Sequence, residues 1–540
     1  MSVSLPAPGF SAARSRPLPY SSATEIRASV SEPPVDLDSL LEGSADVDAA
    51  LRTPAAPSIN ADKLDAFLQQ QDPVQSLRHW LAVLDSPDGT YSAIKIKLYL
   101  ARYIALLDQR INEQLNPILH HSAFQGLEAS WRGLKKLVDT ANQYGNIKIR
   151  CLDVSWREVA KDIDRAADFD QSALFNLIYN QEFGIAGGQP YGVLLGDYQV
   201  SHRPSKQHPT DDINTLRGMA QIGAAAFAPF ICGASAELFG LDNFDKLAQP
   251  LNIDNIFSQQ EYIGWRGLRA MEDARFLGIV LPQVLMREPY VNKLLSPGAL
   301  LFNEQVSYQD SSRHLWGNAC YALGIVLIRE FGDVGWFSHI RGAPRDHLGG
   351  GLVTDFPCLD YGTDSPSSAQ KIITQVVITD SRERQLSGHG LLSLCDCYDT
   401  PFAAFLSCPS LQQAKTYTSK AATANARMSA MLQQILCASR FAHYIKVMIR
   451  DKVGSFTSAN ECQQMLQEWL NQYTTGRDDL AWDALSRYPL RSARIEVREK
   501  PGMPGIYTSI IHLKPHYIVD QLVSELRLTS ELHLPSFGTN

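Results

Sequence analysis

Three groups of residues in this 540-residue chain have side-chain types that catalysis or metal binding requires. Cys395 and Cys397 flank an aspartate, and His389 precedes them by six residues, so this group offers thiolate and imidazole ligands for zinc. A tetrahedral zinc site needs a second pair of ligands at a recognisable spacing, and the sequence around the group has none. We therefore expect free thiols here and no metal.

The other two groups are explained equally well by local structure. Asp197, Ser201 and His202 supply the residue types of a hydrolytic triad, but a polar turn after a strand accounts for the same residues. His120 and His121 are neighbours at an expected helix start, where adjacent side chains point about 100° apart, so a capping or packing role is expected. The P-loop, zincin and nucleophile-elbow motifs are absent from the sequence. We expect no catalytic residue, no metal and no cofactor.

Composition narrows the class of partner and the compartment. The net charge of −8 and the pI of about 5.9 argue against nucleic acid as a partner. Nine scattered cysteines without a C-x-x-C pair are typical of buried thiols in a reducing compartment. Residues 218–236 lack charge, but Gln221, Pro229 and many small residues favour an internal helix and turn over a membrane span. With prolines where a signal peptide would be apolar, we expect a cytoplasmic protein without membrane insertion.

The length predicts several packed units of a mixed α/β (α+β) fold. Residues 1–58 are expected to form a flexible arm that carries one short amphipathic helix, and residues 59–120 a helical segment. An α/β body is expected over 121–390 and a C-terminal domain over 391–540.

The helix predicted within the arm, over residues 36–52, has an apolar face in acidic surroundings. The residues of this face are Leu37, Leu40, Leu41, Val47 and Leu51. An isolated helix of this length is marginally stable alone, so it needs either a partner's groove or a docking place on its own chain.

Long helices are predicted in the segment that follows, with one running from about residue 94 to 115. Its apolar residues are Leu98, Ile104, Leu107, Ile111 and Leu115. A single apolar stripe on a long helix favours a helix–helix interface, either within this chain or with another.

The body alternates predicted strands and helices, which favours a covered, partly parallel sheet. Strands are expected over 147–154, 190–200, 276–285 and 371–380, and helices over 124–141, 172–181, 211–233 and 312–330. The first of these helices carries Leu127, Trp131, Leu134 and Val138 on one face.

A long helix over residues 427–456 is the predicted spine of the C-terminal domain. Apolar residues recur in it at spacings of three and four, and Gln433, Arg440, His443, Arg450 and Asp451 fall on the other, polar side. A companion helix is expected over 459–473, followed by alternating strands over 493–500, 505–514 and 522–532. Three terminal strands leave at least one sheet edge to be covered.

Seven segments, in order along the chain, resemble one protein family. The spine sequence SRFAHYIKVMIRDKVGSF, with ANARMSAMLQQIL before it, is similar to the large subunit of the type VI secretion contractile sheath. The other segments are 124–138, 183–198, 219–234, 261–282, 350–357 and 513–528. The resemblance covers roughly residues 115–535, while the loop 202–214 and the segment 385–400 depart from the family pattern. Those departures leave open a principal sheath subunit or a specialised second copy.

The resemblance implies a contractile tail-sheath-like fold and a structural function. Such a subunit assembles with a small sheath subunit and with its own copies into a helical tube around an inner tube protein. It also meets baseplate proteins and an AAA+ recycling ATPase, which by resemblance would grip the helix with Leu37 and Leu51. The helix with Leu107 is the expected docking place of the small subunit.

By the same resemblance, the C-terminal antiparallel strands are exchanged between neighbouring subunits. The expected exchange residues are Ile495, Val497, Ile506, Ile510, Leu526 and Leu528. Two other interpretations stay open from the residues alone: a soluble α/β enzyme with an unrecognised site, and an adaptor that recruits an AAA+ unfoldase without polymerising.

Overall fold

The computed structural model describes most of the chain from residue 67 onward. The described ranges are 67–83, 92–185, 187–206, 208–291, 300–306, 311–344, 348–359, 372–398, 400–451, 459–477, 486–499, 507–516 and 526–531. The predicted arm helix with Leu37 and Leu51, and the exchange residue Ile506, lie outside these ranges.

The chain comprises two compact units, residues 1–98 and 99–540. In the first, helix α3 (Pro73–Val83) begins with proline at its first position, and Asp72 accepts a hydrogen bond from the Val74 amide at 3.2 Å. Helix α4 (Ala93–Leu119) begins in the first unit and continues into the second.

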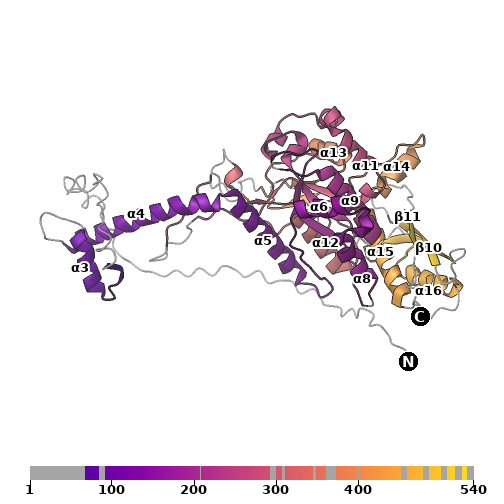
Figure 1. The fold of residues 1–540 in the computed structure, drawn as a ribbon, viewed down its shortest axis with the longest axis horizontal. Helices are drawn as coiled ribbons and strands as arrows, with labels where there is room; N and C mark the ends of the chain where they lie inside the picture. Colours follow the sequence, from indigo (N-terminus) through magenta and orange to yellow (C-terminus); the bar gives the residue numbers. More distant parts are fainter. Residues whose placement is uncertain are drawn as a thin grey trace, which may run out of the picture. The chain divides into compact units, whose positions relative to one another are not determined.

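A six-stranded sheet organises the second unit (Figure 1). Its order is β1-β2-β3-β7-β8-β6; the first four strands are parallel, and β8 and β6 join antiparallel. The strands are β1 (Leu194–Val200), β2 (Phe230–Ala234), β3 (Leu277–Leu281), β7 (Leu391–Asp396), β8 (Ala403–Phe405) and β6 (Leu352–Val353). A small pair, β4 (Val284–Leu285) with β5 (Trp316–Gly317), lies beyond β3 along the chain.

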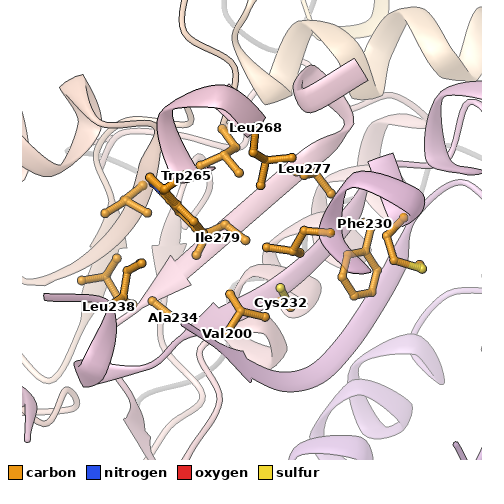
Figure 2. Packing of buried hydrophobic residues seen from close by; sticks show 14 of the residues in the cluster. Val200, Phe230, Cys232, Ala234, Leu238, Trp265, Leu268, Leu277 and Ile279 are labelled. Atoms are coloured by element: carbon orange, nitrogen blue, oxygen red, sulfur yellow. The ribbon is translucent and has the colours of Figure 1, made fainter. Parts of the chain in front are cut away.

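Successive residues of the parallel strands point to opposite faces, and each face has its own apolar cluster. One cluster contains Cys232, Leu277 and Ile279 with helix residues such as Trp265 and Leu268 (Figure 2). Its helices are α6 (Trp156–Arg165), α9 (Asp212–Ala226), α11 (Ile263–Ala270) and α13 (Asp380–Gly388), with the short α7 (Ala173–Phe175), α8 (Gln181–Phe183) and α10 (Ile253–Ser258) nearby.

The opposite face is covered by α5 (Ser122–Ala141), α12 (Cys320–Val334) and the first residues of α15 (Leu432–Asp451). There Ile231, Val280 and Leu392 contact apolar residues of these helices. The central strands β2 and β3 are therefore buried on both faces, which is why they consist of apolar and small residues throughout. The predicted α/β class is confirmed.

Several predicted elements differ in detail. Residues 147–154 contain no strand, and the described residues 372–379 form only isolated bridges at Ile372 and Thr374. The sequence analysis missed β2, which follows α9 directly, and also β7 and β8. The domain boundary expected at residue 390 falls just before β7, so it would divide the six-stranded sheet between two domains. A boundary after β8 keeps these strands together.

The spine is two helices and not one. Helix α14 (Lys420–Ser429) ends before Ala430, and α15 begins at Leu432. The reason is a crossing segment: the Ser410 amide donates to Ala430 O at 3.2 Å, and the Leu432 amide donates to Cys408 O at 3.0 Å. These tertiary hydrogen bonds replace the helical ones at the break.

The C-terminal elements surround the rest of α15. Helix α16 (Ala459–Asn471) packs on a three-stranded antiparallel sheet of order β11-β10-β9, formed by β9 (Leu490–Glu499), β10 (Tyr507–Pro515) and β11 (Leu526–Glu531). Figure 1 shows these strands next to α15 and α16. A third apolar cluster joins them, with Phe441 at its centre, stacked on Trp336 at 4.1 Å between ring centroids.

We expect Phe441→Ala to destabilise the protein by about 3–5 kcal/mol, because a fully buried aromatic ring leaves a cavity among other rings. Urea unfolding followed by tryptophan fluorescence measures this, since Trp336 and Trp469 lie within the cluster. The control is Tyr398→Ala at a side chain that is 87% exposed, with an expected change within about 0.5 kcal/mol. Equal losses in both variants would contradict the central role of Phe441.

Candidate assembly surfaces and domain junction

The residues of the suspected triad do not meet. Asp197 accepts hydrogen bonds from Tyr321 Oη at 3.0 Å and from the Ser130 hydroxyl, which come from the helices α12 and α5. His202 is buried and stacks on Tyr262 at 4.1 Å, and burial lowers its pKa. These residues hold helices onto the sheet and form no nucleophile–base pair.

The suspected metal ligands are also separate. His389 bonds to Asp254 Oδ1 at 2.8 Å and Arg269 Nη1 at 3.3 Å and stacks on Phe257. Cys395 is buried on β7, and burial raises the pKa of its thiol to about 12. Within the described part of the chain, no three His, Cys, Asp or Glu side chains are grouped so that they could hold a metal.

The two adjacent histidines have local structural roles, as predicted. His121 caps α5, its Nδ1 accepting from the Ala123 amide at 3.3 Å. His120 Nε2 lies 3.2 Å from Glu304 Oε1, inside a buried ion-pair network.

This network joins α4, α5 and the segment 300–306. Arg287 donates to Glu304 through two nitrogens, at 2.5 and 3.1 Å, and to Glu128 at 2.9 Å. Burial alone would raise the pKa of Glu304, but hydrogen bonds from Arg287 and from the Tyr290 amide lower it overall. The charges are paired and hydrogen-bonded, which is the condition for burying them.

The end of α4 also binds the segment 300–306 through two asparagines one helical turn apart. Asn112 donates to Leu301 O at 2.8 Å, and the Asn303 amide donates to Asn112 Oδ1 at 3.3 Å. Asn116 accepts from the Gln305 amide at 2.8 Å. Extended backbone is thus held along a helix by side-chain amides.

The apolar stripe predicted for docking on α4 faces outward. The side chains of Ile104 and Leu107 are 56% and 61% exposed, Leu98 and Ile111 are also exposed, and Leu115 is half-buried. Exposed apolar side chains in a row along a helix mark an interaction surface.

Helix α5 presents a second outward stripe. Trp131 is 65% exposed, and Leu127 and Val138 are exposed as well. The buried side of α5 consists of Leu137 and three small residues, Ala129, Gly133 and Ala141, and a Cβ on Gly133 would come within 2.5 Å of the Tyr321 ring. Close approach to α12 therefore turns the large apolar residues outward.

The predicted polar side of the spine lies at a junction with residues of the preceding region. The ring of His443 is buried, its Nε2 donates to Ala226 O at 2.9 Å, and burial lowers its pKa to about 3. About two turns later Arg450 Nη1 donates to the carbonyl oxygens of Glu182, Ile185 and Gly188, each at 3.2 Å. The sequence analysis placed both side chains on the polar side of the spine, and the contacts of His443 show that this side is also buried at the junction.

Lys446, between them, lies among three aromatic rings. Its Nζ is 5.2 Å from the ring centroid of Tyr179, 5.0 Å from Phe183 and 4.7 Å from Phe227. Phe227 ends α9 with a left-handed backbone, φ 52°, which turns its ring toward α15. Burial lowers the pKa of Lys446 to about 8, and cation–π attraction offsets part of the lost hydration.

Comparisons with known proteins match nearly the whole of the second unit. The family model of the EvpB/VC_A0108 tail sheath N-terminal domain matches residues 101–412, and that of the EvpB/VC_A0108 tail sheath gpW/gp25-like domain matches residues 421–532. The type VI secretion system sheath protein TssC1 of Pseudomonas aeruginosa is 38% identical over 432 residues, or 79% of this chain and 85% of the relative. Helix α15 lies in the second matched region, and its cationic side docks on the first.

We expect Lys446→Met to alter the pH dependence of stability. The unfolded lysine keeps its proton up to pH about 10.5, whereas the folded one releases it near 8, so the wild type gains stability as pH rises between these values. Lys446→Met should lack this gain and should be as stable as the wild type, or more so, at neutral pH.

Urea unfolding followed by circular dichroism at several pH values checks this difference. Lys420→Met, at an exposed lysine of α14, serves as the control and should keep the gain. If the free energy of unfolding rose equally with pH in the wild type and in Lys446→Met, the aromatic surroundings of Lys446 would not be the cause of the rise.

Proposed function

Because the chain belongs to the large-subunit family of the type VI secretion contractile sheath, we propose how this sheath subunit assembles. Membership implies a small sheath subunit as partner and polymerisation with its own copies. We propose that the small subunit docks on the outward stripe of α4 and that copies are linked through the C-terminal strands. The observation that carries the first proposal is the exposure of Ile104 and Leu107.

Two features support α4 as the docking element. From Ile104 to Leu115 its apolar residues repeat at three- and four-residue spacing, which suits a partner helix better than a pocket. Its end is bonded to the segment 300–306 by Asn112 and Asn116, so this end of the helix is held in place for a partner.

Strand exchange at the C-terminus is supported by the pairing of β11. Residues Leu526–Glu531 pair antiparallel with β10 from Thr508 to Leu513, and the same pairs form when β11 comes from another copy. Of the predicted exchange residues, Ile495 and Val497 are buried on β9 beneath α16, while Ile510, Leu526 and Leu528 lie on β10 and β11.

The remaining partners follow from the function of a sheath. The tube would surround an inner tube protein, attach to baseplate proteins in the cytoplasm and, after contraction, be taken apart by an AAA+ ATPase. We propose residues 36–52 as the ATPase-binding helix, on the apolar pattern of Leu37, Leu40, Leu41, Val47 and Leu51. In the described ranges, no helix is long and apolar enough to cross a membrane.

Co-expression with the small sheath subunit should yield tubes visible by negative-stain electron microscopy. A deletion of residues 517–540, which removes β11 and keeps β10, should leave only small particles. Small particles from the folded wild-type pair would contradict polymer assembly, and tubes from the deletion variant would contradict strand exchange.

The double variant Ile104→Glu/Leu107→Glu should weaken binding of the small subunit roughly tenfold or more, since two charges would enter an apolar interface. Affinity co-purification followed by titration measures the loss. The control is Gln109→Glu, an exposed residue on another side of α4. If the double variant bound the small subunit as tightly as the wild type, the docking surface would have to lie elsewhere.

A further inference from the structure

The outer edge of β9 is bonded to two glutamine side chains of α16. The Ile495 amide donates to Gln467 Oε1 and the Val497 amide to Gln463 Oε1, both at 3.0 Å. Gln467 Nε2 in turn donates to Ala493 O at 2.9 Å. Gln467 therefore makes an acceptor bond and a donor bond, as a residue of a neighbouring strand does.

The spacing of the two glutamines matches the repeat of the strand. Residues four apart on a helix are separated by about 6 Å along its axis. Residues two apart on an antiparallel strand are separated by about 6.8 Å, and every second residue points its amide to the same edge. Gln463 and Gln467 thus meet consecutive outward amides of β9.

We propose that this glutamine pair closes the β9 edge, so that the sheet accepts a strand from a second copy of this chain only on the β10 side. The occupant is the segment Leu526–Glu531 of that copy, which can repeat the pairing of β11 with Thr508–Leu513. The proposal rests on the strand exchange proposed above and adds its direction. If both edges of the sheet were free, a strand of another copy could also add next to β9. The amide groups of Gln463 and Gln467 occupy the backbone groups of that edge and so prevent this addition.

The test compares two double variants of the full-length chain. Gln463→Ala/Gln467→Ala removes the edge bonds, whereas Gln464→Ala/Glu468→Ala removes an exposed pair on the same helix, joined at 3.1 Å. Hydrogen–deuterium exchange of peptides from 490–499 and sedimentation velocity are the readouts. We expect roughly tenfold faster exchange and larger species for the first variant, and wild-type behaviour for the second.

Wild-type exchange and sedimentation in Gln463→Ala/Gln467→Ala would overturn the proposal, as would equal changes in both variants. Gln463→Met/Gln467→Met keeps the length of the side chains without amide groups, and it should reproduce the effect if the alanine variant fails to fold. Both readouts use the isolated chain. Failure of the wild type to form tubes would therefore reject the proposed function and leave the result on the β9 edge standing.

Discussion

The burial of α15 in two apolar clusters at once is the constraint on which the second unit depends. Leu432 and Leu436, in its first turns, pack with the residues under the central sheet, and Phe441 and Ile445 pack with α16 and the C-terminal strands. Little of the helix is exposed to water, because His443, Lys446 and Arg450 on its remaining side contact the matched region 101–412. A helix with contacts to both matched regions along its length fixes their orientation.

Side-chain amides spaced one helical turn apart bind extended backbone at two places. Asn112 and Asn116 hold the segment 300–306, and Gln463 and Gln467 hold β9. In both cases the rise of about four helical residues matches the two-residue repeat of an extended chain. The amide is suited to this because it donates and accepts without the desolvation cost of a charge. These contacts join helices to extended segments where no strand is available.

The class of fold and the family could be predicted from sequence because the apolar patterns and the order of the seven segments are specific. The polar side of α15 could not be assigned, since a helical pattern distinguishes polar from apolar residues and cannot tell a solvated histidine from a buried one bonded to Ala226 O. Strands β2 and β7 were missed because short, doubly buried strands lack the alternation that identifies a strand. For α5, the sequence gives the apolar stripe, but the small residues opposite it decide which side packs.

A contractile subunit must change some contacts while keeping others. The free-energy cost of exposing each contact to water indicates which ones are kept. Opening the α15 junction would break the hydrogen bonds of His443 and Arg450 to four carbonyl oxygens and would expose the buried side chain of Phe227 to water, which costs free energy. The outward stripes of α4 and α5 carry no such requirement, because apolar contacts can be replaced by similar ones at another register. On the proposed strand exchange, the bonding of the β9 edge by Gln463 and Gln467 would restrict the linking strand to one side, so that copies stay attached in a fixed order while those apolar contacts exchange. We therefore expect each subunit to move as a body, with the change of contacts confined to its outward surfaces.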